Sequence, residues 1–418
     1  MNEAPQGEVL FLAHRIPYPP DKGDKIRSWR LLKYLASRFD VHLACFIDNE
    51  DDFAHVETVR RLCASAYFAP LKKRRGLVRS AQGLLTRSPL SVRYFNDKAI
   101  TRAIDTIRAR PLLAEIVFSS TMAQYVATPF GDRPRIVDFC DADSAKFTEY
   151  AARSKVPMQW IYNREGRLLS ADETTVANWA DVSFAVSPDE ALEFNKRSAI
   201  VKIVDWWANG VDTAYFDPHA SFEKISEPAD IVFTGAMDYR PNAEAADYFV
   251  HEIWPQVLAA APSATFAIVG ARPTKKVQAL ANVKGVQVTG RVDAIQPWIF
   301  QAKIAAAPLR IARGVQNKVL EAMAMAKPVV ATSAAALGIS AHHGEEILVE
   351  DGPKEFAQSL VALLKDPEMR LRLGAAARAR VVADYQWDAQ LSRFAVRLDE
   401  CLRRSDYSSC ASSVPSKS

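Results

Sequence analysis

The sequence has few cysteines, and they are scattered. They form no CxxC pair and no cluster with histidine; the five are Cys45, Cys63, Cys140, Cys401 and Cys410. This spacing argues against a disulfide scaffold and against a zinc site, and it fits the reducing cytoplasm, where we expect the protein to reside. The chain also lacks a GxSxG motif, a Cys/His nucleophile arrangement and a P-loop, so none of these common catalytic motifs explains it.

Long apolar runs and a secretory leader are missing as well. The first apolar run, Val9–Ala13, is short and follows an acidic segment, whereas a signal peptide starts with basic residues. No other stretch approaches the ~20 apolar residues that span a bilayer. We therefore expect any membrane contact to be peripheral, at the inner face of the plasma membrane.

A strong excess of one charge is absent too. The chain has 53 Lys and Arg against 49 Asp and Glu, a net charge of +4. This excess is too small to indicate nucleic acid, which we exclude as a partner. A local exception is Lys72–Arg75 with Arg79, followed by Leu84 and Leu85. That segment fits either a solvated basic face or contact with anionic lipid.

The remaining composition is that of a folded, multidomain protein. Hydrophobic residues make up 49% of the 418 residues and charged residues 24%, as in ordinary globular proteins. Short apolar runs alternate with amphipathic segments along most of the chain. The runs are 9–13, 41–47, 66–69, 115–119, 135–139 and 182–186 in the first half, and 230–234, 265–269, 286–289, 304–307, 328–332 and 347–349 in the second. Strands that alternate with helices predict two doubly wound parallel sheets, an α/β fold.

The domain boundary is predicted from a stretch rich in turn residues. Asn209–Pro228 has little hydrophobic periodicity, so we expect one domain over 1–205 and a second over 206–385. The polar tail, 405–418, has the composition of a disordered end.

Two segments of the second half combine glycine or cations with a helix start. In the first, a strand leads to Gly235, and a helix capped by Asn242 follows. This glycine either serves a tight turn or lets the backbone approach a ligand. In the second, a helix begins near Asn317, with Glu321 one turn later; the cations beside it are Arg310, Arg313 and Lys318. Such a cluster suits a diphosphate with a ribose beside it, or is a solvated helix start.

The first half offers two further segments. Lys22, Gly23 and Asp24 follow a strand and open a helix; they form either a phosphate- and acceptor-binding loop or a helix start capped by Asp24. Asp141 and Asp143 form a DxD triplet, a weak indication of a metal site. Asp143 can simply cap the next helix, whereas Asp141 ends a strand and is the better candidate for a reaction site.

The chain resembles a known family in several of these segments. The run NKVLEAMAMAKPVVAT (317–332) resembles the donor-binding signature of retaining glycosyltransferases of family 4, and NGVD, FTGAMDYRPN, FAIVGARP and VTGRVDAIQPW agree with it. The runs HRIPYPPDKGDKIRSW and VDFCDADSAKF are similar to the branch associated with PEP-CTERM/exosortase A clusters. The resemblance spans about Val9 to Arg403. It implies the GT-B fold, two Rossmann-like domains facing each other across a cleft, with a helix at about 386–404 crossing back to the first.

The resemblance also implies roles for individual residues. Glu321 matches the second glutamate of the family's paired motif, which binds the nucleotide ribose, whereas Arg313 occupies the place of the first. We assign a catalytic role to Asp141, Arg313 and Lys318. We assign donor binding to Gly235, Arg310, Gly314, Asn317, Glu321 and Arg291, and acceptor or phosphate binding to the Lys22–Asp24 loop.

The implied reaction is transfer of a sugar, with retention, from a UDP- or GDP-sugar. The acceptor is expected to be a glycan or a polyprenyl-linked glycan of exopolysaccharide biosynthesis, and no metal or other cofactor is expected. Two alternatives remain open: a non-hydrolysing nucleotide-sugar epimerase, and a non-catalytic scaffold of a polysaccharide assembly complex. Arg313 in place of glutamate favours the scaffold, and Glu321, Lys318 and Gly235 speak against it.

Overall fold

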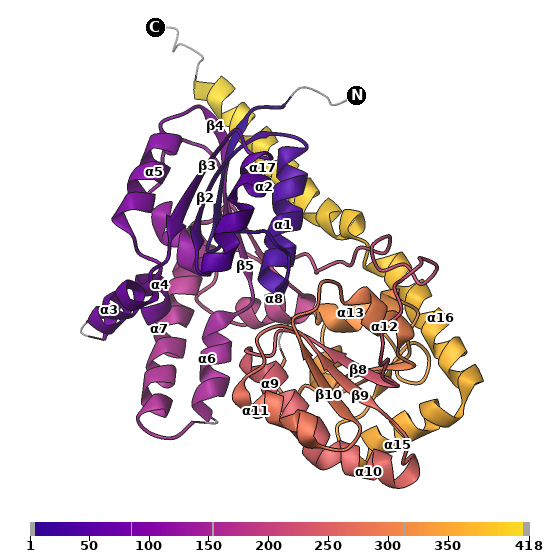
Figure 1. The fold of residues 1–418 in the computed structure, drawn as a ribbon. Helices are drawn as coiled ribbons and strands as arrows, with labels where there is room; N and C mark the ends of the chain where they lie inside the picture. The colour runs from indigo at the N-terminus through magenta and orange to yellow at the C-terminus, as the bar shows by residue number, and fades with distance from the viewer. Residues whose placement is uncertain (1–4, 85, 153, 313, 413–418) are drawn as a thin grey trace, which may run out of the picture. The chain divides into compact units, whose positions relative to one another are not determined.

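The computed structural model describes residues 5–84, 86–152, 154–312 and 314–412, with the side chains of 405–412 left out. The chain divides into two compact units (Figure 1). The first contains residues 1–207 and 391–418, and the second contains 208–390. The divisions thus fall at Trp207 and Gln390, two and five residues beyond the predicted positions 205 and 385.

The first unit is built on a parallel sheet. In the described residues it has seven strands in the order β3-β2-β1-β4-β5-β6-β7. The strands are β1 Glu8–Ala13, β2 Asp40–Ile47, β3 Ser65–Pro70, β4 Leu112–Phe118, β5 Arg135–Cys140, β6 Val182–Ala185 and β7 Val204–Trp206. The central strands are almost fully buried, because helices cover both faces of a parallel sheet. Figure 1 shows β2 and β3 between α5 on one side and α1 on the other.

Helices connect these strands. They are α1 Gly23–Ala36, α2 Val56–Arg60, α3 Lys73–Gly83, α4 Leu90–Tyr94, α5 Lys98–Arg108, α6 Asp143–Ala152, α7 Met158–Trp179 and α8 Pro188–Asn195, with 3-10 turns at 50–55 and 120–125. Helix α17, Trp387–Ser412, closes the unit from Leu391 onward. Its Phe394 packs against the rings of Tyr34, Phe184 and Trp207.

The second unit has a smaller parallel sheet. Its described strands follow the order β10-β9-β8-β11-β12-β13. They are β8 Ile231–Thr234, β9 Phe266–Val269, β10 Val286–Gly290, β11 Ile304–Ala307, β12 Val329–Ala331 and β13 Leu348–Val349. The helices are α9 Arg240–Tyr248, α10 Trp254–Ala260, α11 Lys275–Ala279, α12 Gln296–Gln301, α13 Asn317–Ala324, α14 Ser333–Ala336, α15 Pro353–Lys365 and α16 Pro367–Asp384. A π-turn at 249–253 joins α9 to α10. The predicted pair of doubly wound α/β domains is confirmed.

One expectation about the tail is wrong. Residues 405–412, predicted as disordered, continue helix α17, while 413–418 lie outside the described residues. Leu391, Phe394 and Leu398 are buried and anchor the helix. Once a helix is anchored, each further residue adds one hydrogen bond, so a polar composition does not end it.

A buried arginine ties three parts of the first unit together. Arg27 of α1 is fully buried and donates two hydrogen bonds to the carboxylate of Asp138, at 2.9 and 3.1 Å. It also donates to the carbonyl oxygen of Trp207 at 2.8 Å, and its guanidinium lies 3.4 Å from the centre of that indole ring. Two parallel bonds and a stacked ring suit the planar guanidinium and no other cation. These contacts hold together the start of α1, the end of β5 and Trp207, the last residue before the second unit.

We predict that Arg27→Met destabilises the first unit by about 3–5 kcal/mol, because it leaves the buried Asp138 carboxylate unpaired. Urea unfolding followed by circular dichroism measures this, with the exposed Arg102→Met as the control. A loss below about 1 kcal/mol, the range of surface pairs, would contradict the assigned role.

Candidate active site

A glycine lies at the carboxyl end of each of three neighbouring strands of the second unit. Gly235 follows β8, Gly270 follows β9 and Gly290 ends β10, with φ angles of 152°, 155° and 70°. A Cβ atom at Gly270 would lie 1.7 Å from the carbonyl oxygen of Gly235, so the two backbones touch where no side chain fits. The edge of the sheet is therefore bare backbone, where a ligand can approach the main chain.

A lysine and an asparagine lie directly over the first of these glycines. Lys318 Nζ donates a hydrogen bond to Asn242 Oδ1 at 2.5 Å. A Cβ atom at Gly235 would lie 2.7 Å from Asn242 Nδ2 and 3.4 Å from Lys318 Nζ. Asn242 Nδ2 in turn donates to the carbonyl of Ala236 at 2.9 Å. Gly235 is thus required by the close approach of two side chains, and the predicted pair of Gly235 and Lys318 comes together in the fold.

The predicted cap at Asn242 is wrong. Helix α9 begins at Arg240, its flanking residue is Tyr239, and Pro241 occupies the first turn. Proline favours the first helical positions, since its ring presets the helical φ. The helix therefore starts two residues earlier, and the Asn242 side chain contacts Lys318 instead.

Burial shifts the pKa values of Lys318 and Glu321 in opposite directions, and each shift favours the neutral form. It lowers the pKa of Lys318 to about 8, although the nearby Glu321 opposes the shift. It raises the pKa of Glu321 to about 7, against the attraction of Lys318. The two residues lie three positions apart on α13, on the same helix face. A half-buried cation and a half-buried carboxylate with pKa values shifted toward neutrality are frequent at functional sites.

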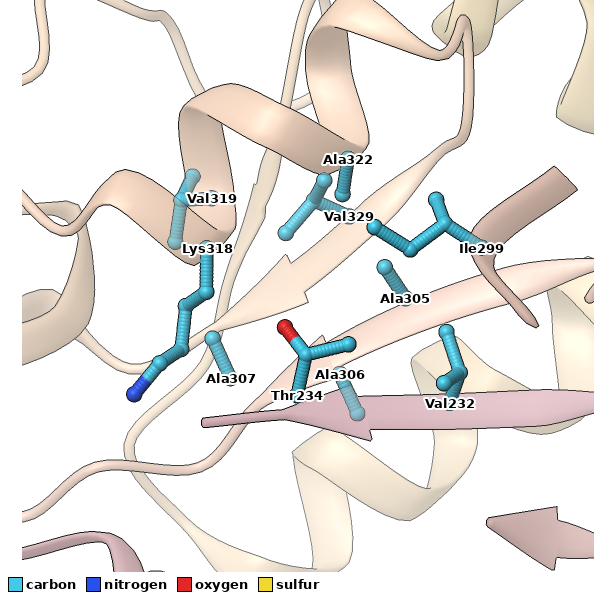
Figure 2. Close-up of a pocket in the computed structure, with 10 residues that line it drawn as sticks. All are labelled: Val232, Thr234, Ile299, Ala305, Ala306, Ala307, Lys318, Val319, Ala322 and Val329. Atoms are coloured by element: carbon cyan, nitrogen blue, oxygen red, sulfur yellow. The ribbon is translucent and has the colours of Figure 1, made fainter. Parts of the chain in front are cut away.

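A small cavity lies beside Lys318, between α13 and the sheet. It measures ≈ 10 Å³, room for about one water molecule, and is lined mainly by Val and Ala side chains of β8, β11 and α13. Figure 2 shows the Lys318 stem at its edge, with the nitrogen beyond the end of the strand that carries Thr234. The cavity is too small for a sugar nucleotide.

The other predicted donor residues have different surroundings. Asn317 Oδ1 accepts a hydrogen bond from Asn209 Nδ2 at 3.1 Å, while Asn317 Nδ2 is buried without a partner among the described residues. The guanidinium of Arg310 lies 4.6 Å from the centre of the Tyr248 ring. Gly314, with a φ of 61°, is buried just before α13, whereas Arg291 is exposed after β10. Arg313 lies outside the described residues. Sequence reasoning did not assign a role in the site to Asn242 or Gly270, although both lie in segments that carry the resemblance.

In the first unit, Asp24 joins the end of β1 to the start of α1. It accepts a hydrogen bond from His14 Nε2 at 3.1 Å and forms an ion pair with Arg15 at 3.1 Å. Burial alone would raise its pKa, but Arg15 and His14 hold the pKa of this carboxyl well below its usual range. The alternative of a cap at Asp24 is wrong: α1 begins at Gly23 and its flanking residue is Lys22, while the Asp24 carboxylate is engaged by the side chains of Arg15 and His14.

Asp141 lies at the end of a strand with unusual backbone. Cys140, the last residue of β5, and Ser119, which follows the neighbouring β4, have φ angles of 65° and 78°. Such angles are uncommon outside glycine and cluster at functional sites. Burial, together with Glu190, raises the pKa of Asp141 to about 7. Asp141 is therefore a half-buried acid with a pKa close to neutrality, whose role in the reaction stays a prediction.

Asp143, the second aspartate of the DxD triplet, does not act as the expected cap. Helix α6 begins at Asp143 itself, and Asp143 lies 3.8 Å from Lys146. The amide of Ser144 instead donates to Glu173 at 3.0 Å, so a carboxylate from α7 satisfies this helix start.

Comparisons with known proteins address the identity of these units. Residues 228–366 match the family described as Glycosyl transferases group 1. This match lies within the second unit, which therefore contains a glycosyltransferase domain of this family. The chain is 29% identical over 198 residues to a GDP-mannose-dependent monoacylated alpha-(1-6)-phosphatidylinositol monomannoside mannosyltransferase of Corynebacterium glutamicum. That similarity covers 43% of this chain and 52% of that protein, so the chain spans about half the length of the curated relative.

Solved structures show that the glycosyltransferase has the GT-B fold. Sucrose-phosphate synthase of Thermosynechococcus elongatus matches it with a TM-score of 0.70 at 17% identity, covering 96% of this chain and 100% of that one. Anabaena Alr3699/HepE in complex with UDP-glucose matches with a TM-score of 0.65 at 14% identity, covering 94% and 99%. The predictions of fold and enzyme class are confirmed. Membership of family 4, and of its particular branch, stays a prediction.

The contact between Gly235 and Gly270 gives a test of the site's construction. We predict that Gly270→Ala destabilises the second unit by at least about 2 kcal/mol, because the new Cβ collides with the Gly235 carbonyl and the φ angle is strained. Gly290→Ala is the matched control, since a Cβ there meets nothing within 4 Å and costs only the backbone preference, about 1 kcal/mol. Equal losses in urea unfolding would show that the close approach is unimportant.

Proposed function

We propose that this glycosyltransferase transfers a sugar from a UDP- or GDP-sugar to a glycan acceptor, with retention of anomeric configuration. The position of the Lys318 ammonium over the bare backbone of Gly235 carries the proposal. An ammonium beside a glycine backbone is suited to a diphosphate, whose charge would compensate the burial of Lys318. A GDP-mannose-dependent relative and a structural neighbour in complex with UDP-glucose support nucleotide-sugars as the donor class.

Helix α13 supplies the second half of the proposed donor site. Its N-terminus, where Asn317 has a buried and unpaired Nδ2 atom, favours anions through its free N–H groups and dipole. One turn later comes Glu321, which we propose as the acceptor of hydrogen bonds from the ribose hydroxyls. Diphosphate and ribose are adjacent in a nucleotide, so residues one turn apart on the same helix face can bind both.

The proposed chemistry relies on electrostatic stabilisation of the leaving group. As the bond between sugar and diphosphate breaks, negative charge grows on the diphosphate, and Lys318 together with the helix N–H groups stabilises it. Retention requires the acceptor hydroxyl to attack from the face that the diphosphate leaves. An oxygen of the departing phosphate can then take the proton of that hydroxyl. No strong base from the protein is needed in this scheme.

We assign acceptor binding to the first unit. Asp141, whose pKa is near neutrality, follows β5. The Lys22–Asp24 segment follows β1, and its Asp24 contacts His14 and Arg15. These groups can bind hydroxyls of an acceptor sugar. We propose a lipid-linked acceptor of exopolysaccharide biosynthesis and a peripheral place on the inner face of the membrane. Among the described residues, no helix is long and apolar enough to cross a membrane.

Binding of a nucleoside diphosphate tests the donor site. We predict that Lys318→Met lowers the affinity for UDP or GDP at least tenfold, because a charge-assisted hydrogen bond contributes about 1.5–3 kcal/mol. Affinity of the parent should fall as the pH rises through about 8, where unliganded Lys318 loses its proton, and this dependence should vanish in the variant. Calorimetry with the exposed Lys275→Met as control measures both. An unchanged affinity would place the nucleotide elsewhere.

We also propose that the reaction needs no divalent metal. The cation Lys318 already lies where the diphosphate is expected. Of the two DxD carboxylates, Asp143 lies 3.8 Å from Lys146, and Asp141 has a pKa that the charge of Glu190 helps to raise. Activity should therefore survive EDTA. Loss of activity with EDTA and recovery with Mn²⁺ would instead make Asp141 and Asp143 metal ligands.

A further inference from the structure

A strongly basic segment of the first unit takes no part in the proposed reaction. Residues 71–96 contain seven Lys and Arg and no Asp or Glu, in a chain whose net charge is only +4. They form helices α3 and α4, a hairpin at the edge of the unit (Figure 1). A segment whose charge exceeds that of the whole chain needs either an internal partner or an external one.

One side of α3 is fitted closely to α4. A Cβ atom at Gly76 would lie 2.5 Å from the ring of Tyr94, and one at Gly83 would lie 3.1 Å from Leu90. Between them, Ser80 donates a hydrogen bond to the carbonyl of Leu90 at 2.9 Å. The packed side of α3 thus consists of small residues, and its large side chains point elsewhere.

Those large side chains are exposed. Leu77, Val78 and Leu84 are 63%, 60% and 42% exposed. At 100° per residue, Leu77 and Leu84 lie on one side of the helix, turned away from Gly76 and Gly83. Four exposed cations at the start of the helix lack an ion-pair partner among the described residues; they are Lys72, Lys73, Arg74 and Arg75. Leu85 lies outside the described residues. These exposed cations and aliphatic side chains are called the α3 face below.

The hairpin is held in place by two successive residues of α7. Arg164 donates to the carbonyl of Gly83 at 2.6 Å and to that of Thr86, at the end of α3. Glu165 is buried and accepts hydrogen bonds from the amides of Leu90 and Ser91 at 2.7 and 2.8 Å, at the start of α4. The cation meets a helix C-terminus and the carboxylate an N-terminus, as the helix dipoles require. The α3 face is therefore presented outward by a fixed support.

An exposed tryptophan lies near this support. Trp160 is 60% exposed and precedes Arg164 by one turn of α7, so the two side chains share a helix face. Since Arg164 contacts the end of α3, Trp160 lies on the side of α7 that meets the hairpin. Tryptophan is the side chain most suited to the boundary between water and lipid.

We propose that the α3 face, together with Trp160, docks the glycosyltransferase on the surface of an anionic lipid bilayer. Cations without acidic neighbours complement anionic headgroups, each contributing about 1 kcal/mol near such a surface. The aliphatic side chains between them can enter the headgroup region, which would remove their exposed area from water. The docking surface lies in the first unit and shares no residue with the donor site, although the benefit of docking rests on the proposed lipid-linked acceptor.

Vesicle co-sedimentation of the full chain tests the proposal. The parent should partition onto vesicles of phosphatidylcholine mixed with phosphatidylglycerol, weakly onto phosphatidylcholine alone, and less with added salt. Arg74→Glu/Arg75→Glu should lower the partition coefficient at least about tenfold, because four units of charge change beside the membrane. Leu77→Ser/Val78→Ser and Trp160→Ala should each lower it too, since apolar contact is lost.

Matched controls separate this surface from charge and hydrophobicity in general. Lys98→Glu/Arg102→Glu makes the same charge change on exposed residues of α5, and Leu371→Ser removes a leucine that is 74% exposed in the second unit. Both should partition as the parent does. Every variant should bind UDP or GDP as the parent does, so failure of docking is distinguishable from failure of the donor site. Absence of anionic-vesicle binding by the parent, equal losses in the controls, or self-association through the α3 face would each overturn the proposal.

Discussion

The charge of Lys318 is the constraint on which the proposed donor site depends. A cation held away from water favours its neutral form, and burial lowers the pKa of this lysine to about 8. Its one hydrogen-bond partner in the described residues is the neutral Asn242, and its carboxylate neighbour Glu321 has a raised pKa itself. The site is therefore electrostatically incomplete, and an anion at Gly235 would complete it. Gly235 leaves room for the Asn242 side chain there, because a Cβ atom at this position would lie 2.7 Å from Asn242 Nδ2.

In the first unit, by contrast, most buried charges already have partners. Its most buried charges are already paired, above all Arg27 with Asp138, and Glu165 is satisfied by backbone amides. Such pairs hold structure in place and leave little for a ligand. Asp141 differs from these pairs, since burial and the carboxylate of Glu190 both keep its pKa high. The two units thus have different proposed roles: the second would bind an anion, and the first provides a frame of paired charges around Asp141.

Periodicity and apolar runs predicted both sheets, because parallel strands buried on two faces need continuous apolar residues. The edge strand β7 was missed, since three residues carry no pattern. Asp24, Asn242 and Asp143 are good caps by type, yet none of them caps its helix. Contacts distant in sequence engage Asp24 and Asn242, with His14 and Arg15 for the first and Lys318 for the second. At the start of α6, the carboxylate of Glu173 accepts from the amide of Ser144 instead. The resemblance located Lys318 and Glu321 correctly on one helix, whereas their shifted pKa values depend on burial, which spacing alone does not reveal.

The central claim is that Lys318 and the bare edge at Gly235 bind the diphosphate of the donor. A crystal structure of the glycosyltransferase with a bound nucleoside diphosphate tests it most directly. The account predicts a phosphate oxygen at hydrogen-bond distance from Lys318 Nζ, about 2.7–3.2 Å, and close to the backbone of Gly235, with the ribose beside Glu321. A nucleotide bound elsewhere, with Lys318 still paired only to Asn242, would contradict it.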